Sequence, residues 1–561
     1  MNKAKAIAAA ALGMAAVAGG NYGAGWLTLS FLRLDTSALR WNTYLQYVRA
    51  LHDPQVHAYA GRISAAGYLG FGIPLLLWLL IVYFLYRRKA AALHGDARFA
   101  RASDLSKHGL FKPSGNGILV GKFRGRLVRL SGQQFAILAA PTRSGKGVGV
   151  VIPNLLEYAE SMVVLDIKQE NFDLTSGWRA SQGHEVFLFN PFAEDRRTHR
   201  WNPLSYVSSD PAFRVSDLMS IAAMLYPDGA DEQKFWVSQA RNAFMAFTLF
   251  LFEAWDDAAK RGVPISLRTR PTLGEVYRLS SGDGTELKAF YQLLSQQPFL
   301  STNARSAFAN LLSQAAETFA SILGTFKEPL NAWINPVLDA ATSADDFLLT
   351  DVRKKKMTIY IGIQPNKLAE SRLIVNLFFS QLINLNTREL PQNNPALKYQ
   401  CLLLMDEFTS IGRVEIIASA VSYMAGYNVR LLPIIQSMAQ LDATYGKDVS
   451  RTMITNHALQ IVYAPREQQD ANDYSDMLGY TTVRKQNITR GKSRGDVSRS
   501  QSEERRALML PQELKAMGAD KEVFFYEGIP HPVMCHKIRY YQDKHFTSRL
   551  LPKLTIPPLS V

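Results

Sequence analysis

One short stretch, residues 135–156, constrains the fold more than any other part of the sequence. Phe135–Ala140 is an unbroken apolar run, which predicts a strand buried inside a sheet. The loop Pro141–Gly147 follows with small residues and a Gly-Lys pair, and Val148–Leu156 has the apolar composition of a buried helix. A strand, such a loop and a helix in this order direct the loop amides and the helix N-terminus at a phosphate group. The stretch predicts an α/β fold with a nucleotide-binding phosphate loop.

Two residues of this loop have defined tasks in a phosphate site. Gly145 lets the backbone approach the ligand closely, and Lys146 reaches the β- and γ-phosphates. The usual pattern begins with Gly and ends with Ser or Thr, whereas this chain has Ala140 and Gly147 there. On the loop alone, an ordinary strand-to-helix turn remains the alternative. The predicted nucleotide-binding residues are Thr142, Arg143, Ser144, Gly145, Lys146 and Gly147.

A second apolar run supplies the carboxylates that such a site needs. Cys401–Met405 reads as a buried strand, and Asp406 and Glu407 follow it directly. An Asp at this position holds Mg²⁺, and the adjacent Glu orients or activates the attacking water. Gln436 ends a later apolar run and is the predicted γ-phosphate sensor, with a solvent-facing side chain as the alternative. Together with the loop, these residues predict an ATPase with ATP and Mg²⁺ as cofactors.

Further apolar runs complete one parallel sheet. The expected strands lie at 135–140, 161–166, 185–189, 357–361, 401–405, 429–435 and 459–463. Near-continuous apolar runs are typical of parallel strands covered on both faces. Asp166 and Lys168 close the second of these strands and are expected at the same edge of the sheet as the loop, where ligands of such sheets bind.

The long interval between the third and fourth strands predicts an inserted helical domain. We expect nucleotide-binding parts at residues 91–209 and 316–561, with an all-α domain at 210–315 between them. Arg484–Arg506 is rich in Arg, Lys, Ser and Gln and is expected to be a mobile basic loop, solvated or in contact with phosphates. The formal net charge of +15 favours polyanionic neighbours but does not choose among them.

The first ninety residues carry a membrane signal. Ala6–Leu32 has no charged residue and would be about 40 Å long as a helix, against a hydrocarbon core of about 30 Å. Ile63–Tyr86 is a second uncharged run, and the positive residues Arg87–Lys89 that follow it favour the cytoplasmic side for the body of the chain, although residues 33–62 contain four Arg of their own. The nucleotide site of the hydrophilic body, which needs cytosolic ATP, decides this orientation. We expect transmembrane helices at 6–32 and 63–86 with a short periplasmic loop, 33–62. A cleavable signal peptide is the alternative for the first run.

Several strings together give the chain a family resemblance. It resembles type IV secretion coupling proteins of the TraG kind from near residue 94 to near 530, and in its two-helix anchor. The strings that carry the resemblance are Leu93–Phe99, Ala140–Gly147, Leu165–Asn171, Phe189–Pro191, Arg200–Leu204, Met405–Phe408, Ile435–Leu441 and Arg506–Leu514. Gly after the loop Lys is typical of this family, so Gly147 does not indicate a dead site.

The resemblance implies a RecA-like P-loop NTPase domain with an inserted all-α domain, preceded by two transmembrane helices. It also implies a homo-hexamer on the bacterial inner membrane, with ATP hydrolysis between subunits. The implied partners are the secretion channel components and either a relaxase with its single-stranded DNA or protein effectors. Arg430 and Arg451 are candidates for an arginine acting on a neighbouring subunit's nucleotide. Two other functions remain open: an FtsK-like double-stranded DNA translocase, and a substrate receptor platform switched by nucleotide with little hydrolysis.

Overall fold

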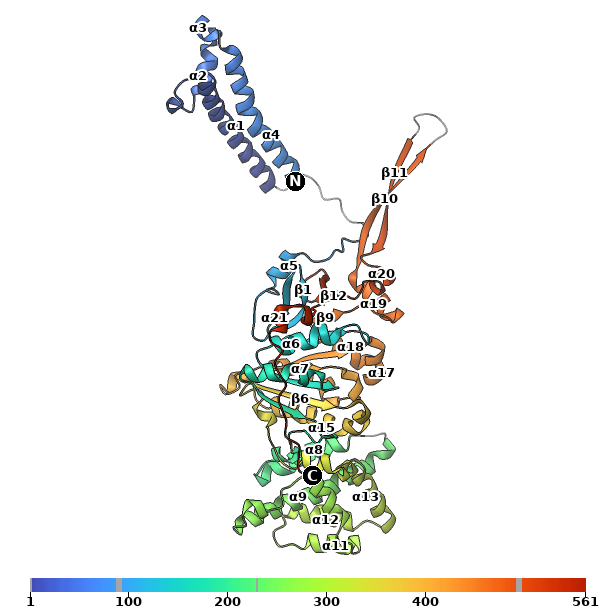
Figure 1. Cartoon of the computed structure of the whole chain (residues 1–561). Coiled ribbons are helices and arrows are strands. Elements are labelled where there is room, and N and C mark those ends of the chain that lie inside the picture. The colour runs from blue at the N-terminus through green and yellow to red at the C-terminus, as the bar shows by residue number, and fades with distance from the viewer. Residues whose placement is uncertain (1–2, 87–92, 229–230, 491–496) are drawn as a thin grey trace. The chain divides into compact units, whose positions relative to one another are not determined.

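The computed structural model describes residues 3–86, 93–228, 231–490 and 497–561. The chain divides into two compact units, Met1–Leu93 and His94–Val561, which are described separately (Figure 1). Arg87–Lys89, which were used in predicting the orientation of the membrane segment, lie outside the described part of the chain.

The first unit is a pair of long apolar helices joined by a helical connection. The helices of this unit are α1 (Lys3–Phe31), α2 (Thr43–Arg49), α3 (Pro54–His57) and α4 (Ala60–Tyr86). α1 and α4 pack closely, because a Cβ atom added to Gly70 would lie 2.5 Å from the backbone of Ala24. The Trp78 indole also donates a 2.9 Å hydrogen bond to the Ala9 carbonyl. Residues 33–62, expected as a loop, are largely helical.

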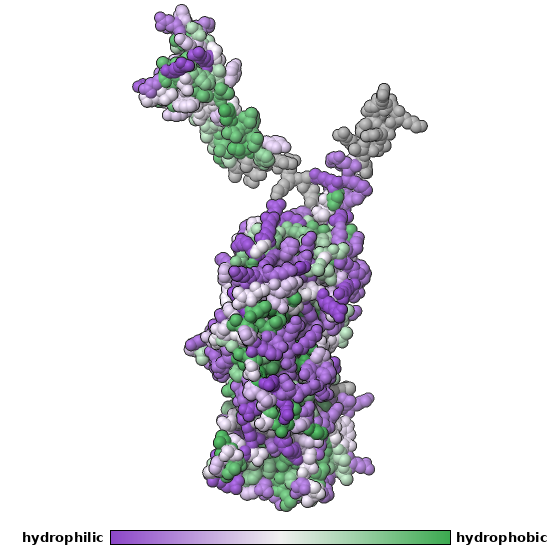
Figure 2. Space-filling view, viewed as in Figure 1, coloured by the Kyte–Doolittle hydropathy of each residue, from purple (hydrophilic) through white to green (hydrophobic). Residues whose placement is uncertain are grey.

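By length and composition, both long helices of this unit are sufficient to cross a membrane. The apolar spans are Ala6–Phe31 and Ala60–Phe84, in agreement with the expected helices at 6–32 and 63–86. Figure 2 shows apolar residues on the surface of the helix pair. On α4, Ile73 and Leu76 are 61% and 64% exposed. Such exposure of large apolar side chains is unfavourable in water, so this surface requires an apolar environment.

The second unit is built on one long mixed sheet. Its strands are β1 (Ile118–Phe123), β2 (Arg126–Leu130), β3 (Ala136–Ala139), β4 (Ser161–Ile167), β5 (Glu185–Phe189), β6 (Met357–Ile363), β7 (Cys401–Met405), β8 (Val429–Ile435), β9 (Leu459–Val462), β12 (Lys521–Tyr526) and β13 (Val533–His536). Among the described residues they form an 11-stranded sheet in the order β2-β1-β13-β12-β9-β3-β8-β7-β4-β6-β5.

The strands from β9 to β5 in this order run parallel and are the strands that the sequence predicts. They are covered on both faces. Along β4, Val163 and Leu165 face one hydrophobic core, whereas Met162 and Val164 face the other. Helices α6 (Ile152–Glu157) and α7 (Glu170–Ser181) belong to the second of these faces, as shown by the contact of Phe172 with Tyr360 of β6 at 5.4 Å.

The other end of the sheet is an antiparallel extension that the sequence analysis did not predict. β12 pairs antiparallel with β9, β13 with β12, β1 with β13 and β2 with β1. Its strands carry charged residues within them, among them Glu522 of β12, which is fully buried. Such residues interrupt the apolar runs by which the parallel strands are recognised.

Between β5 and β6 the described residues form helices, as expected for an inserted helical region. These helices are α8 (Pro211–Leu225), α9 (Lys234–Lys260), α10 (Leu273–Ser281), α11 (Leu287–Ser295), α12 (Thr302–Leu312), α13 (Ala316–Leu330) and α14 (Pro336–Ala341). The expected end at residue 315 is wrong, because α13 and α14 continue the region. Phe326 of α13 stacks on Phe247 of α9 with ring centroids 5.4 Å apart, so the two helices share one core.

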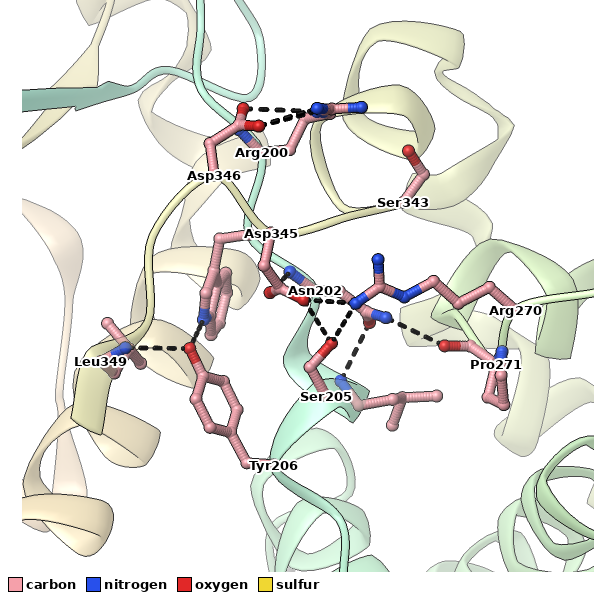
Figure 3. A network of polar contacts seen from close by, with 12 residues as sticks. Arg200, Asn202, Ser205, Tyr206, Arg270, Pro271, Ser343, Asp345, Asp346 and Leu349 are labelled. Carbon is pink, nitrogen blue, oxygen red and sulfur yellow. Dashed lines mark hydrogen bonds and ion pairs between the residues drawn. The ribbon is translucent and has the colours of Figure 1, made fainter. Parts of the chain in front are cut away.

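Two chain segments connect the helical region to the sheet, and polar contacts join them (Figure 3). Asp346 accepts a 2.7 Å hydrogen bond from the Arg200 backbone and forms an ion pair with its guanidinium, also at 2.7 Å. The neighbouring Asp345 accepts hydrogen bonds from the Asn202 backbone at 2.9 Å and from Ser205 Oγ at 2.6 Å. The outgoing and returning segments are therefore held to each other at the base of the helical region. The string Arg200–Leu204, noted in the sequence, forms the outgoing segment.

The basic stretch 484–506 is not the mobile loop that its composition predicts. β10 (Tyr480–Arg490) and β11 (Val497–Ala507) pair antiparallel from Tyr480 opposite Ala507 to Arg490 opposite Val497. Residues 491–496 lie outside the described part. Opposite charges across the strands support the pairing, as in the 3.0 Å ion pair of Arg484 with Glu503. The Arg505 guanidinium also lies 3.5 Å from the centre of the Tyr480 ring.

Eight further α-helices of this unit are described, and all but α15 and α19 are shorter than ten residues. They are α5 (Ala102–Lys107), α15 (Leu368–Asn386), α16 (Glu415–Ala420), α17 (Met438–Tyr445), α18 (Lys447–Thr455), α19 (Gln468–Leu478), α20 (Pro511–Lys515) and α21 (Lys544–Thr547). Of these, α15 is the long one and contributes Phe378 to the core between the sheet and the helical region, where it stacks on Phe189 of β5 at 5.8 Å.

Candidate nucleotide site

The predicted phosphate loop connects β3 to the helical turn Gly147–Val151, which continues into α6. Gly145 has φ +88°, a conformation in which side chains other than glycine are strained. Its carbonyl accepts a 2.8 Å hydrogen bond from the Gly149 backbone, so the helical turn begins at the loop. A Cβ atom added to Gly145 would meet no atom within 4 Å, which leaves open space beside the loop. The loop therefore has the backbone form and the free volume that a phosphate group requires.

The structure brings the predicted lysine and both predicted carboxylates together. Lys146 Nζ lies 3.3 Å from Asp406 Oδ1 and forms a closer ion pair with Glu407 Oε1. Both carboxylates follow β7 at its carboxyl end, and Lys146 lies at the end of the loop that follows β3. The lysine side chain is only 12% exposed, so the ion pairs are shielded from water.

Gln436 completes a continuous set of contacts across the site. It directly follows β8, between β3 and β7 in the sheet. Its Nε2 donates a 2.8 Å hydrogen bond to Glu407 Oε2, and its Oε1 accepts a 3.1 Å hydrogen bond from Thr142 Oγ1. Glu407 itself has φ +57°, an uncommon conformation for this residue type. Gln436 therefore fixes Glu407 and connects it to the phosphate loop.

The two carboxylates have different electrostatic environments. Burial raises the pKa of Asp406, with the positive charge of Lys146 acting in the opposite direction. Burial also acts to raise the pKa of Glu407, but hydrogen bonds from Lys146 and Gln436 outweigh it, and the pKa lies below its ordinary value. Glu407 is thus held as a carboxylate, the form in which it accepts a proton or a hydrogen bond from water.

The oxygen atoms of the site fit a hard divalent cation and a phosphate. In the described part of the chain, Ser144 Oγ is buried without a hydrogen-bond partner, and the buried Asp406 Oδ1 has only its 3.3 Å ion pair with Lys146. Mg²⁺ prefers oxygen ligands and is commonly held by one or two carboxylates together with phosphates and water. Among the described residues no cluster of three or more His, Cys, Asp or Glu forms a metal-binding group. The donor set is therefore that of a cation bound together with its phosphate ligand.

Asp166 and Lys168 also lie at the carboxyl edge of the sheet, as predicted. The Asp166 carboxylate accepts hydrogen bonds from the backbone of Phe172 at 2.8 Å and of Asn171 at 3.3 Å, at the start of α7. Burial raises the pKa of Asp166 to about 7. Lys168, with φ +117°, contributes positive charge that lowers the pKa of Glu407. Asp166 thus secures the helix next to the site.

One of the two arginines considered for action on a neighbouring subunit is excluded. Arg430 is fully buried, and its guanidinium donates to the backbone carbonyls of Gln134 at 2.7 Å and Leu130 at 3.2 Å. That prediction was wrong because the arginine lies inside β8 and joins strands of its own chain. Arg451 is exposed on α18, and its role stays a prediction.

A third lysine near the loop was not predicted. Lys537 Nζ donates a 3.1 Å hydrogen bond to the carbonyl of Ser144. It follows β13 in the antiparallel extension. No local pattern around residue 537 indicates this contact, because the two residues are far apart in the sequence.

The chain is similar in sequence to proteins of secretion and conjugation systems. A family model described as "Type IV secretory system Conjugative DNA transfer" matches residues 95–557. VirD4 of Rhizobium radiobacter is 31% identical over 463 residues, which are 80% of this chain and 64% of that protein. TraG of Escherichia coli is 28% identical over 509 residues, 82% of this chain and 78% of that protein. The chain spans just under two thirds of the VirD4 proteins of Rhizobium radiobacter and Rhizobium rhizogenes, 64% and 66%.

Solved structures agree with the fold. The plasmid coupling protein TrwB in complex with the ATP analogue ADPNP has a TM-score of 0.55 and 16% identity, covering 80% of this chain and 96% of that one. TrwB in complex with ADP and Mg²⁺ has a TM-score of 0.54 and 15% identity, covering 81% and 96%. The likeness confirms the expected fold class, a RecA-like nucleotide-binding sheet with an all-α insertion.

Proposed function

The chain belongs to the type IV secretory system conjugative DNA transfer family, and from this membership we propose that it is the system's coupling ATPase. In this role it binds a substrate, either a relaxase with its single-stranded DNA or an effector protein, and delivers it to the secretion channel at the expense of ATP. The observation that carries the proposal is the set of contacts Thr142–Gln436–Glu407–Lys146 at the carboxyl edge of the parallel strands.

Each residue of this set has a proposed task. Lys146 leaves Glu407 and Asp406 when a nucleotide phosphate offers it a stronger partner, and it then binds the β- and γ-phosphates. Asp406 is the carboxylate that would hold Mg²⁺, and the remaining loop residues, Thr142 to Gly147, would surround the phosphates with backbone amides. The chemistry that a Mg²⁺ ion held by Asp406 would supply is positive charge beside the phosphates, which favours the transfer of the γ-phosphoryl group to water.

Glu407 is the proposed general base or water-positioning group. Once Lys146 has moved to the phosphates, Glu407 Oε1 is free to accept a hydrogen bond from water, while Gln436 keeps Oε2 in place. Gln436 thereby couples the phosphate loop, through Thr142, to the residue that activates water. This exchange of partners is a means by which nucleotide binding readies the site for hydrolysis.

The proposed location is the bacterial inner membrane, with the unit His94–Val561 in the cytoplasm. The two apolar helices α1 and α4 and their exposed apolar surface support it. Proposed partners are the secretion channel components, which membership of the family described as "Type IV secretory system Conjugative DNA transfer" supports, and further copies of this chain in a hexamer. Retention of the full chain in the membrane after an alkaline wash, and the mass of its N-terminus, test the anchor against a cleaved signal peptide.

The decisive measurement is the ATPase rate of the full chain in detergent or lipid, alone, with single-stranded DNA and with double-stranded DNA. We expect hydrolysis that single-stranded DNA stimulates, and that Lys146→Ala reduces at least about 100-fold. Lys354→Ala, which removes an exposed lysine paired with Asp351 at 3.4 Å, is the matched control and should keep the rate.

The same experiment separates the other functions. Selective stimulation by double-stranded DNA would favour a translocase of the FtsK kind, and hydrolysis indifferent to DNA would favour effector proteins as the substrate. Nucleotide binding without hydrolysis would contradict the ATPase and favour the nucleotide-switched receptor platform, for which the missing hydroxyl at Gly147 is the motivating observation.

A further inference from the structure

A residue that follows the last strand of the antiparallel extension donates a hydrogen bond to the backbone of the phosphate loop. Lys537, the first residue after β13, donates a hydrogen bond of 3.1 Å from Nζ to the carbonyl oxygen of Ser144. Hydrogen bonds from a charged donor are stronger than those between neutral groups. The antiparallel extension therefore contacts one peptide group of the nucleotide site directly.

The position of this carbonyl determines where the following amide points. In a trans peptide the C=O of one residue and the N–H of the next lie on opposite sides of the bond. No described peptide bond is cis, so the Gly145 N–H is directed away from Lys537. Open space lies beside Gly145. Lys537 thus fixes the orientation of the Ser144–Gly145 peptide, and with it the direction of the Gly145 amide.

Two buried side chains of the sheet act on the Lys537 ammonium, one through a ring contact and one through its charge. Its Nζ lies 3.7 Å from the centre of the Tyr463 ring, within the range of a cation–π contact. Tyr463 follows β9 and is fully buried. Glu522 of β12 is also fully buried, and its negative charge acts on Lys537 in opposition to the burial that lowers the lysine pKa to about 8. The lysine ammonium therefore lies against the ring face of Tyr463, and the negative charge of Glu522 acts on it electrostatically.

Glu522 has few other contacts. Its Oε1 accepts a 3.1 Å hydrogen bond from Cys535 Sγ, and its Oε2 has no hydrogen-bond partner among the described residues. Burial raises the Glu522 pKa to about 7. A buried carboxylate with so few donors lowers the stability of the fold.

Two glycines leave the room that these side chains occupy. A Cβ atom at Gly121 of β1 would overlap Glu522 Oε1, and one at Gly149 would overlap the Tyr463 hydroxyl. Gly149 belongs to the helical turn that starts at the phosphate loop. The space for Glu522 and Tyr463 is thus built into both the antiparallel extension and the nucleotide-binding turn.

We propose that Lys537 is a positioning residue of the nucleotide site, which orients the Ser144–Gly145 peptide toward the phosphates and itself lies against the Tyr463 ring, with the buried Glu522 as the nearby negative charge. The inference rests on the proposed nucleotide binding and adds a residue to it. The antiparallel extension then sets the affinity for nucleotide, whereas the residues after β7 and β8 perform the chemistry.

The test is Lys537→Met in the full chain, with Kd for ADP and the kcat and KM for ATP as readouts. We expect Kd and KM to rise about tenfold, as for the loss of one hydrogen bond from a charged group, with kcat changed less than about threefold. Lys537→Arg, which restores a charged donor, should recover most of the affinity. Lys122→Met is the matched control, because Lys122 of β1 lies opposite His536 and forms an ion pair with Asp543 at 2.5 Å, away from the loop.

A second variant keeps the inference testable if Lys537→Met folds poorly. Glu522→Gln preserves the size of the side chain and should raise KM about threefold, and the double variant should be no weaker than Lys537→Met alone. Affinity within twofold of the wild type in Lys537→Met, a fall confined to kcat, or independent effects in the double variant would each overturn the inference. Binding lost in Lys146→Ala but kept in Lys537→Met overturns this inference alone, whereas a wild type that binds no nucleotide overturns the proposed function as well.

Discussion

The parallel and antiparallel halves of the sheet differ in both composition and task. In the parallel half, from β9 to β5, apolar residues fill the strands, and polar residues appear where the strands end, as Asp406 and Gln436 do. In the antiparallel half, β12 carries the buried Glu522 within the strand, and Lys537 follows β13. Apart from Arg430, which is buried inside β8, the parallel half therefore presents these polar groups at an edge, whereas the antiparallel half encloses Glu522 within a strand.

This difference separates two kinds of contribution to one site. Groups at the strand ends are free to exchange partners, as we propose for Lys146 in leaving Glu407 for a phosphate. Groups of the antiparallel half keep one arrangement. Among them, Lys537 after β13 donates a hydrogen bond to Ser144 and so fixes the loop. Substitutions in the parallel half should therefore change turnover, and substitutions in the antiparallel half should change stability or nucleotide affinity.

The largest expected effect is that of Glu407→Gln in the parallel half. The change removes the group proposed to activate water but leaves the loop amides and Lys146 intact, so hydrolysis should fall at least about 100-fold while ADP affinity is retained. Steady-state ATPase rates and nucleotide binding on the same preparation measure both. Glu415→Gln, an exposed carboxylate paired with Arg413, is the control. Normal hydrolysis in Glu407→Gln would remove this residue from the mechanism.

A smaller effect is expected from Gly121→Ala in the antiparallel half. The added methyl group would overlap Glu522 Oε1 and lie 2.9 Å from Cys535 Sγ, in a buried place with little room for adjustment. We expect the free energy of unfolding to fall by about 2 kcal/mol. Denaturant unfolding measures it, with Gly324→Ala of α13 as the control because a Cβ there meets no atom within 4 Å. Unchanged stability in Gly121→Ala would show that the enclosed groups move freely.

The same difference explains how much of the fold was predictable. Strands such as β7, with five buried apolar residues in succession, are recognised from the sequence because both of their faces are covered. β12 begins with Lys521 and the buried Glu522, which read as solvent-facing, and β10 and β11 have the polar composition of a loop. Their strand form comes from pairing with a partner strand, which a local pattern does not report.

The site was predictable to the same extent. Lys146, Asp406, Glu407 and Gln436 each adjoin an apolar run, so their place at the sheet edge follows from the sequence, and the structure brings them together. The hydrogen bond of Thr142 to Gln436 and that of Lys537 to Ser144 join residues hundreds of positions apart. Such contacts depend on strand order, which the sequence pattern leaves open.

The smallest expected effect lies where the two halves meet. Val462 of β9 and Val523 of β12 share a small core with Tyr474 and Leu478 of α19. On the same helix, Asp470 accepts a 3.2 Å hydrogen bond from the backbone of Met438, at the start of α17 after β8. Asp470 therefore joins a helix beside the antiparallel half to one that follows the parallel half.

Asp470 makes the stability of this junction depend on pH. Burial raises its pKa to about 6 from an ordinary 3.8, so the native state holds its proton more tightly than the unfolded chain does. The resulting stabilisation is complete below pH 3.8 and is lost as the pH rises through 6. Asp470→Asn keeps an acceptor for Met438 without the charge, so above pH 7 it should be more stable than the wild type by about 1.5 kcal/mol. Unfolding measured at pH 5 and pH 8 should show this difference growing with pH, and a constant difference would mean that Asp470 is well solvated and that the junction is open to water.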